Sequence, residues 1–221
     1  MSRIEWPYLT PGVPDHYFNR GQVPITKEEV RVLTLAKARL GPGMTVYDIG
    51  SGTGTLAMEA ARLVAPAQVL AVEVNPEACN LITANSRTFG LKNVRVINGR
   101  APAALAGLPP PQRVLVGGSG GQLEGILAAC HEVLQPGGII IINAVTVETL
   151  STALAFGYHR GYQVEAVAAN LARLEPAGRY HIWRPLNPVY IVQLIQGVGG
   201  NKQEAGGAAH DSVLSPTNGR K

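Results

Sequence analysis

Thr45-Val-Tyr-Asp-Ile-Gly-Ser-Gly-Thr-Gly-Thr-Leu56 is the stretch of this sequence that decides the fold. A short β-prone run, Val46 to Ile49, is followed by glycines at positions 50, 52 and 54, and an apolar-periodic segment then begins. Strand, glycine turn and helix build a ligand cradle at the carboxyl end of a strand in an open α/β sheet. Glycine suits this turn because it lacks a Cβ that would meet the ligand and because it tolerates positive φ.

The spacing of these glycines argues against a dinucleotide as the ligand. The dinucleotide fingerprint needs glycine at its first, third and sixth positions, whereas the sixth position here is Thr55. Asp48, directly before the loop, would repel a pyrophosphate and suits a ligand that carries positive charge. S-adenosylmethionine has an ammonium and a sulfonium group. We therefore predict an S-adenosylmethionine site made by Asp48, Gly50, Ser51, Gly52, Thr53 and Gly54.

A second landmark supports this ligand. Val69 to Glu73 is predicted to be the next strand, and its terminal carboxylate can accept hydrogen bonds from both ribose hydroxyls. The pattern Asp-x-Gly-x-Gly-x-Gly followed by a strand-ending acid resembles the class I methyltransferases. The alternative interpretation is a tight strand–helix turn followed by a glutamate on the surface.

Composition limits the classes of protein. The 221 residues suit one domain with appendages, and 46% hydrophobic residues allow a full core. The net charge of +4 allows an anionic substrate without requiring nucleic acid. No apolar run approaches the ~18 residues of a membrane span, and two cysteines, Cys79 and Cys130, favour a reducing compartment, the cytoplasm. The five histidines are scattered, so we predict no metal site.

The chain divides into an arm, a domain and a tail. Residues 1–25 are rich in proline and glycine and are predicted to form an ordered arm. Thr26-Lys-Glu-Glu29 matches a capping box that starts a helix with Val30, Leu33, Lys37 and Leu40 on one face. Residues 26–196 are predicted to form the domain. Residues 197–221 are polar and glycine-rich and are predicted to be a flexible tail.

Strands and helices alternate from residue 45 to residue 157, which indicates a parallel sheet with right-handed crossovers. The predicted strands span residues 46–49, 69–73, 94–98, 113–116 and 139–142. Residues 164–174 and 189–196 are predicted to be a terminal antiparallel pair, joined by a basic, aromatic loop at 179–184. The fold class is therefore α/β, with the Rossmann-like seven-stranded sheet of class I methyltransferases.

A second glycine cradle, Gly117-Gly-Ser-Gly-Gly121, follows the fourth strand. Ligands of open parallel sheets lie at this edge, so we expect the substrate to lie here beside the cofactor. The Asn/Asp-Pro-Pro-Tyr motif with which many methyltransferases bind an amino group of a base is missing. Asn187-Pro-Val-Tyr190 is similar to that motif, but it opens the last strand, so we interpret it as a strand start with Tyr190 in the sheet. A plain glycine turn is the alternative for Gly117–Gly121.

The ordered set of motifs resembles a known family, the decarboxylating precorrin methyltransferases of cobalamin biosynthesis. The segments that carry the resemblance are Gly-Val-Pro-Asp15, Val-Pro-Ile-Thr-Lys27, Asp-Ile-Gly-Ser-Gly-Thr-Gly54, Asn-Pro-Glu-Ala78, Gly-Arg-Ala-Pro102, Gly-Gly-Ser-Gly-Gly121 and Asn-Ala-Val-Thr-Val-Glu-Thr149. The resemblance implies methylation of carbon 15 of a tetrapyrrole macrocycle and loss of carbon dioxide from the acetate on carbon 12. It also implies a homotetramer.

The resemblance assigns residues position by position. Thr26 matches a threonine that contacts the cofactor, Glu73 matches the ribose acid, and Ala101 matches the residue whose backbone meets the adenine. Arg100, which precedes it, stands where relatives carry an acid. The substrate side is implied to comprise Gly117, Gly118, Ser119 and Asn143. No general acid or base is identified, because methyl transfer from a sulfonium depends largely on positioning.

Two rival functions remain open at this point. The first is a class I methyltransferase that acts on RNA or protein, since a fold does not fix its substrate. The second is a non-catalytic protein that binds the cofactor. We expect no nucleic-acid or membrane partner. Arg173, Arg179, His181 and Arg184 suit a substrate with many carboxylates, and a solvated loop or a subunit contact is the alternative.

Overall fold

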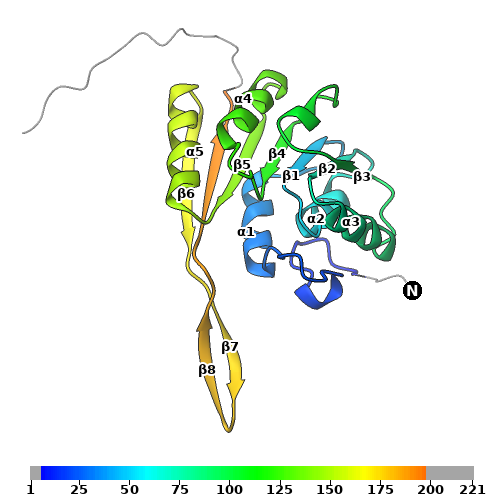
Figure 1. Cartoon of the computed structure of the whole chain (residues 1–221), viewed down its shortest axis with the longest axis vertical. Coiled ribbons are helices and arrows are strands. Elements are labelled where there is room, and N and C mark those ends of the chain that lie inside the picture. The colour runs from blue at the N-terminus through cyan, green and yellow to red at the C-terminus, as the bar shows by residue number, and fades with distance from the viewer. Residues whose placement is uncertain (1–5, 198–221) are drawn as a thin grey trace, which may run out of the picture.

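A seven-stranded sheet forms the centre of the computed structural model, which describes residues 6–197 (Figure 1). The strand order is β3-β2-β1-β4-β5-β9-β6. The parallel strands are β1 (Val46–Ile49), β2 (Val69–Glu73), β3 (Val94–Asn98), β4 (Arg113–Val116) and β5 (Ile139–Ala144). Strand β9 (Val189–Ile195) runs antiparallel to β5 and to β6 (Gln163–Ala169). The predicted fold class, including the terminal antiparallel pair, is confirmed.

Helices cover both faces of the sheet and give it three layers. The α-helices are α1 (Glu28–Ala38), α2 (Thr55–Val64), α3 (Pro76–Thr88), α4 (Leu123–Val133) and α5 (Val147–His159), with short 3-10 turns η1 (Asp15–Tyr17) and η2 (Ala103–Leu105). Alternate strand residues face opposite layers: Tyr47 belongs to the core beneath α4 and α5, whereas Val46 belongs to the core beneath α1, α2 and α3. The reversal of strand order between β1 and β4 is the switch point at which ligands of such sheets bind.

Two predictions about α1 are wrong. The helix begins at Glu28 with Lys27 as its N-cap, and no side chain caps it, so the capping box at Thr26 does not form. Its buried face holds Val30, Arg31, Thr34, Leu35 and Ala38, whereas Leu33 is exposed. The apolar periodicity failed here because a charged residue, Arg31, occupies the inward face.

The segment between β6 and β9 also differs from the prediction. Residues 164–174 do not form one strand: β6 ends at Ala169, and β7 (Ala172–Ala177) pairs with β8 (Tyr180–Pro185) in a separate antiparallel sheet. The predicted basic loop is therefore the turn and second strand of a hairpin, which projects from the body of the molecule (Figure 1). Strand-forming Tyr, Ile and Trp in this run were signals for β-structure.

The remaining predictions concern termini, cysteines and membranes. The predicted tail, apart from Gly197, lies outside the described residues. Cys79 and Cys130 are buried and free. Within residues 6–197, none of the helices combines the length and apolarity needed to cross a membrane.

Candidate functional site

A cavity of about 760 Å³ lies at the carboxyl ends of the parallel strands. It is bordered by both glycine cradles, by the end of β2, by the arm and by the segment that leads into β9. Seven of the predicted site residues line it, namely Thr26, Gly50, Ser51, Gly52, Glu73, Gly117 and Asn143. The fold thus brings together residues up to 117 positions apart in sequence, from 26 to 143. The volume is that of a typical small-ligand pocket.

Glu73 ties the first glycine loop to the end of β2. One carboxylate oxygen, Oε2, accepts the backbone N–H of Gly52 at 2.9 Å, and Oε1 accepts that of Asn75 at 2.9 Å. The residue is only 9% exposed. Each carboxylate oxygen has a further lone pair, so Glu73 can hold the loop and still accept hydroxyl groups from a ligand in the cavity.

Three predicted cofactor residues lie beneath the loop and do not line the cavity. Asp48 is fully buried, and its Oδ2 accepts the hydroxyl of Ser51 at 2.6 Å. Burial raises the pKa of Asp48 to about 6, although the Ser51 hydrogen bond opposes this change. Thr53 and Gly54 are packed under the turn, where a Cβ at Gly54 would lie 3.0 Å from the Ile82 side chain. In this structure these three residues support the loop from below.

The two glycine cradles touch each other. A Cβ added at Gly50 would lie 2.2 Å from the carbonyl oxygen of Gly118, and Gly50 has a φ of +67°. Both observations require glycine at position 50. Gly118 is different, because a Cβ there would come no nearer than 3.9 Å to Gly50. The loop after β4 therefore has room for a Cβ at Gly118, in ordinary van der Waals contact with Gly50.

The other predicted residues line a smaller pocket of about 50 Å³ that shares Gly50 and Glu73 with the main cavity. Its walls include Arg100, Ala101, Gly118 and Ser119. The Arg100 side chain turns toward the second cradle, where its Nη1 would lie 3.2 Å from a Cβ at Gly120. This placement puts the second glycine cradle beside the predicted adenine position.

Asn143, at the end of β5, presents its amide to the main cavity. The Thr34 hydroxyl lies 2.7 Å from the Val30 carbonyl and 3.0 Å from Asn143 Oδ1, and its single proton can serve only one of these two acceptors. Asn143 lines the cavity, so its amide group can form a hydrogen bond with a ligand there.

Sequence reasoning missed one wall of the cavity. Pro185, Leu186, Asn187 and Val189 line it, although Asn187–Tyr190 was interpreted only as a strand start. Tyr190 does lie in β9, as expected. The antiparallel direction of β9 could have indicated this wall. Tyr190 pairs with Ala144 at the carboxyl end of β5, so the residues that precede β9 lie at the edge of the sheet where the cavity is.

The charged residues around the cavity also differ from expectation. Arg173 is paired with Glu29 at 2.6 Å and with Asp15 at 3.0 Å, and it does not line the cavity. Arg179, His181 and Arg184 lie on the hairpin. Lys27 and Glu73 are the charged side chains that the described part of the chain contributes to the cavity wall. Within residues 6–197, no group of three His, Cys, Asp or Glu side chains could hold a metal ion.

Comparisons with known proteins agree with this geometry. Residues 15–196 match the family described as the precorrin methyltransferase domain. A probable cobalt-precorrin-6B C(15)-methyltransferase (decarboxylating) from Pyrobaculum calidifontis is 40% identical over 192 residues, which cover 86% of this chain and 98% of that protein.

Two solved structures share the fold and much of the sequence. The precorrin-6Y C5,15-methyltransferase structure from Geobacter metallireducens matches with a TM-score of 0.81 and 37% identity, covering 86% of this chain and 100% of that chain. The precorrin-8W decarboxylase from Methanobacterium thermoautotrophicum matches with a TM-score of 0.79 and 35% identity, covering 82% of this chain and 98% of that chain.

Proposed function

This chain belongs to the precorrin methyltransferase family. From this we propose that it methylates carbon 15 of a precorrin or cobalt-precorrin ring and also removes carbon dioxide from a side chain of that ring. The methyl donor is S-adenosylmethionine. The carbon dioxide comes from the acetate side chain on carbon 12. The observation that carries the proposal is the cavity at the switch point of the sheet, where Glu73 borders a glycine loop that packs against Gly118 too closely for a Cβ at Gly50.

The cavity residues fit the cofactor. The backbone of Gly50, Ser51 and Gly52 borders open space beside the Glu73 carboxylate, which suits the methionine and ribose parts of the molecule. Ala101 and Arg100 border the adjoining pocket and are assigned to the adenine. Thr26, which directly follows the arm, also lines the cavity. The contribution of Asp48, Thr53 and Gly54 to cofactor binding is indirect, because they support the glycine loop from below.

The cofactor supplies an electrophilic methyl group on a sulfonium. The residues of this chain then have to place the acceptor carbon in line with that methyl and exclude water. Gly117, Gly118 and Ser119 provide a surface without bulky side chains for a large, flat ring, and the amide of Asn143 can form a hydrogen bond with a ring substituent. No general base is assigned, because the electron-rich ring can itself be the nucleophile that takes the methyl group, with S-adenosylhomocysteine as the leaving group. In the decarboxylation, the conjugated ring can take up the electron pair of the C–C bond that breaks as carbon dioxide leaves.

An acceptor assay tests this function against its rivals. Formation of S-adenosylhomocysteine is measured with three acceptors in parallel: a carbon-15-unmethylated precorrin, total RNA and a protein extract. We expect turnover with the tetrapyrrole alone. Turnover with RNA or protein, or binding of the cofactor without any turnover, would replace the proposal by one of the two rival functions.

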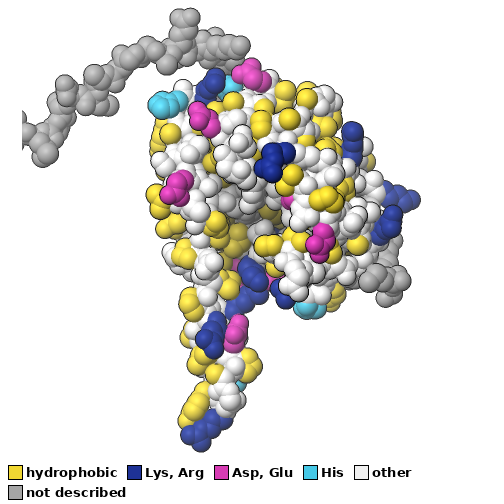
Figure 2. Space-filling model, viewed as in Figure 1, with side chains coloured by type: hydrophobic (Ala, Val, Ile, Leu, Met, Phe, Trp, Pro, Cys, Tyr) yellow, Lys and Arg dark blue, Asp and Glu magenta, His cyan; other side chains and the backbone are white. Residues whose placement is uncertain are grey.

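We also propose that the chain forms a homo-oligomer, a tetramer by the family resemblance. The β7–β8 hairpin is a separate two-stranded sheet, and such hairpins are marginal in water without a packing partner. Its side chains Leu174, Tyr180 and Trp183 are 54%, 61% and 69% exposed. Figure 2 shows hydrophobic side chains along this projection and basic ones at its tip. A second copy of the chain would bury them.

We propose a cytoplasmic location, for which the two free, buried cysteines are the support. We propose that the chain consists of an arm (1–25), a methyltransferase domain (26–196) and a tail (197–221). In the structure the arm contributes Val23, Pro24 and Ile25 to the cavity wall, so the arm belongs to the functional unit.

A further inference from the structure

The rest of the protein holds the arm, which includes η1, by its backbone. In Figure 1 the arm lies below α2 and beside the lower end of α1. Two arginines donate hydrogen bonds to its backbone. Arg62 donates to the carbonyls of Trp6 and Tyr8, and Arg31 donates to the carbonyl of Val13 and to that of Thr26, which directly follows the arm. Of these two sets of hydrogen bonds, the set made by Arg31 is the one beside the cavity, because Thr26 lines the cavity.

All three guanidinium nitrogens of Arg31 form hydrogen bonds in the interior. Its side chain is 0% exposed. Nε donates to Glu59 at 2.7 Å, Nη1 donates to Asp15 at 2.7 Å and to the Thr26 carbonyl, and Nη2 donates to the Val13 carbonyl. The guanidinium carbon also lies 4.9 Å from the centre of the Phe18 ring.

The two carboxylates that pair with Arg31, those of Glu59 and Asp15, accept further hydrogen bonds from other segments. Glu59 is buried on α2, and its second oxygen accepts the backbone N–H of Gly12 at 2.6 Å. Asp15 accepts a further bond from Arg173 on β7 at 3.0 Å. Burial would raise the pKa of Asp15, but the hydrogen bonds and charges of Arg31 and Arg173 keep it below its ordinary value. Both ends of the segment 12–26 are thus fixed to one buried charged unit.

This unit lies directly behind a wall of the cavity. Residues 23–27 all line the cavity. The Pro24 carbonyl would lie 3.5 Å from a Cβ at Gly52, so the arm also touches the glycine loop. Arg31 holds the end of this wall through the Thr26 carbonyl, and Asn85 holds the preceding part of the arm at Asn19.

We propose that Arg31 is a positioning residue for methyl transfer, which sets the cofactor-facing wall by holding the arm against α1 and α2. It does not touch the cavity itself, and it acts through Thr26 and its neighbours. The inference rests on the proposed function in one respect, that S-adenosylmethionine occupies this cavity.

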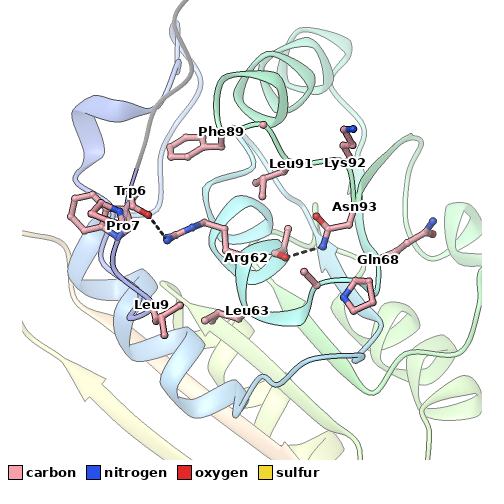
Figure 3. Close-up of a pocket in the computed structure, with 14 residues that line it drawn as sticks. Trp6, Pro7, Leu9, Arg62, Leu63, Gln68, Phe89, Leu91, Lys92 and Asn93 are labelled. Atoms are coloured by element: carbon pink, nitrogen blue, oxygen red, sulfur yellow. Dashed lines mark hydrogen bonds between the residues drawn. The ribbon is translucent and has the colours of Figure 1, made fainter.

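Arg62 provides the matched control. Its Nη2 donates to the Trp6 carbonyl at 2.9 Å and to the Tyr8 carbonyl at 2.6 Å, and Figure 3 shows it reaching from α2 toward Trp6. It borders a different pocket, of about 860 Å³, none of whose lining residues also lines the cofactor cavity. Loss of Arg62 should loosen the start of the arm and leave the wall at residues 23–27 in place.

The test compares Arg31→Met/Glu59→Met with Arg62→Met in the full chain. The double substitution replaces the buried pair by apolar side chains, which proteins often tolerate better than a single unpaired charge. The affinity for S-adenosylhomocysteine is measured by calorimetry well below each melting temperature, and amide exchange is followed at residues 23–27. We expect the double variant to weaken binding by about tenfold or more and to exchange faster there. Arg62→Met should bind as wild type does, even where its melting temperature falls.

The outcomes separate the inference from the function. Wild-type affinity and exchange in the Arg31→Met/Glu59→Met variant, with binding by the wild type, would overturn the inference alone. Failure of the wild type to bind would overturn the proposed function and the inference with it. Should the double variant not fold, Arg31→Lys is compared in the same way: it keeps the charge but cannot reach all four acceptors, so unchanged affinity in it would also overturn the inference.

Discussion

Glu73 has two roles at the scale of a single residue, because its carboxylate holds the loop and borders the cavity. Replacement by alanine would leave the N–H groups of Gly52 and Asn75 without their acceptor. A loss of affinity in that variant could then come from a less stable loop as well as from a lost contact to the ligand. Glu73→Gln keeps the volume and an acceptor for one of these two N–H groups, so the stability of the variant is measured beside its affinity. We expect it to weaken S-adenosylhomocysteine binding by about 1–3 kcal/mol, the value of hydrogen bonds to a charged group.

Calorimetry with this ligand checks the Glu73 prediction. Glu77→Gln is the matched control, since Glu77 is an exposed acid on α3 that does not line the cavity. Equal affinities of the Glu73→Gln and Glu77→Gln variants would remove Glu73 from the binding site.

Asp48 makes stability depend on pH. Its pKa is raised to about 6 in the folded protein, mainly by burial, from an ordinary value of 3.8. The folded state therefore binds the proton more tightly than the unfolded state. This contribution to stability is fully present below pH 3.8 and is lost as the pH rises through 6. The loss amounts to about 3 kcal/mol at 1.36 kcal/mol for each pH unit.

Asp48→Asn should remove this dependence. We expect the variant to unfold at higher urea concentration than the wild type near pH 8, and the advantage to shrink as the pH is lowered toward 4. Urea titrations of both proteins across that range measure the difference in unfolding free energy. A difference that stays constant with pH would show that Asp48 ionises normally in the folded protein.

At the scale of elements, the loops after β1 and β4 act as one unit, because Gly50 and Gly118 are in contact. Gly50→Ala should destabilise the protein by about 1–3 kcal/mol or more, through strain and through the contact of its Cβ with the Gly118 backbone. Because that contact pushes the two loops apart, cofactor binding should also be lost. Gly118→Leu should fold, since a Cβ there meets nothing closer than 3.9 Å. Its side chain would enter the proposed substrate space, so we expect turnover to be lost while cofactor affinity stays within about tenfold.

Thermal unfolding, calorimetry and the methyl-transfer assay together check the loop predictions. Gly118→Ala serves as the control with minimal added volume and should remain active. A folded Gly118→Leu protein with wild-type turnover would show that the substrate does not pack on this loop.

The parallel half of the fold could be predicted from sequence because each of its elements carries a local signal. Glycine and proline end the elements, and the strand boundaries at 46–49, 69–73, 94–98 and 113–116 agree with the structure. The inward face of α1 could not be predicted, since burial of Arg31 depends on partners from distant segments, Asp15 and Glu59. The missed cavity wall at Asn187 likewise arises from strand pairing between β5 and β9.

The site was predictable to the extent that its residues follow strands. Glu73 and Gly50 end their strands at the same edge, and the structure brings them together. The depth of each residue was not predictable: Asp48, Thr53 and Gly54 belong to the same motif but are buried below the cavity. Strand alternation alone places Asp48 on the opposite face from Tyr47 and Ile49, but burial of that face depends on the helices that pack on it.

At the scale of the whole molecule, the hairpin predicts association. Leu174→Ser/Trp183→Ser should reduce the molecular mass in solution, because it removes apolar surface that a second copy would cover. Tyr158→Ser is the control, since Tyr158 is 68% exposed on α5, away from the hairpin. Light scattering of the wild type and both variants measures the mass. A wild-type protein that is monomeric, or a hairpin variant of unchanged mass, would contradict the proposed interface.

The reaction itself tests the central claim most directly. The enzyme is incubated with a cobalt-precorrin or metal-free precorrin that lacks the carbon-15 methyl group, together with S-adenosylmethionine carrying a ¹³C-labelled methyl, and the product is analysed by mass spectrometry. The account predicts that the ring gains one labelled methyl group and loses one carbon dioxide. A ring that gains the label but keeps all its carboxyl groups, or that is recovered unchanged, would contradict it.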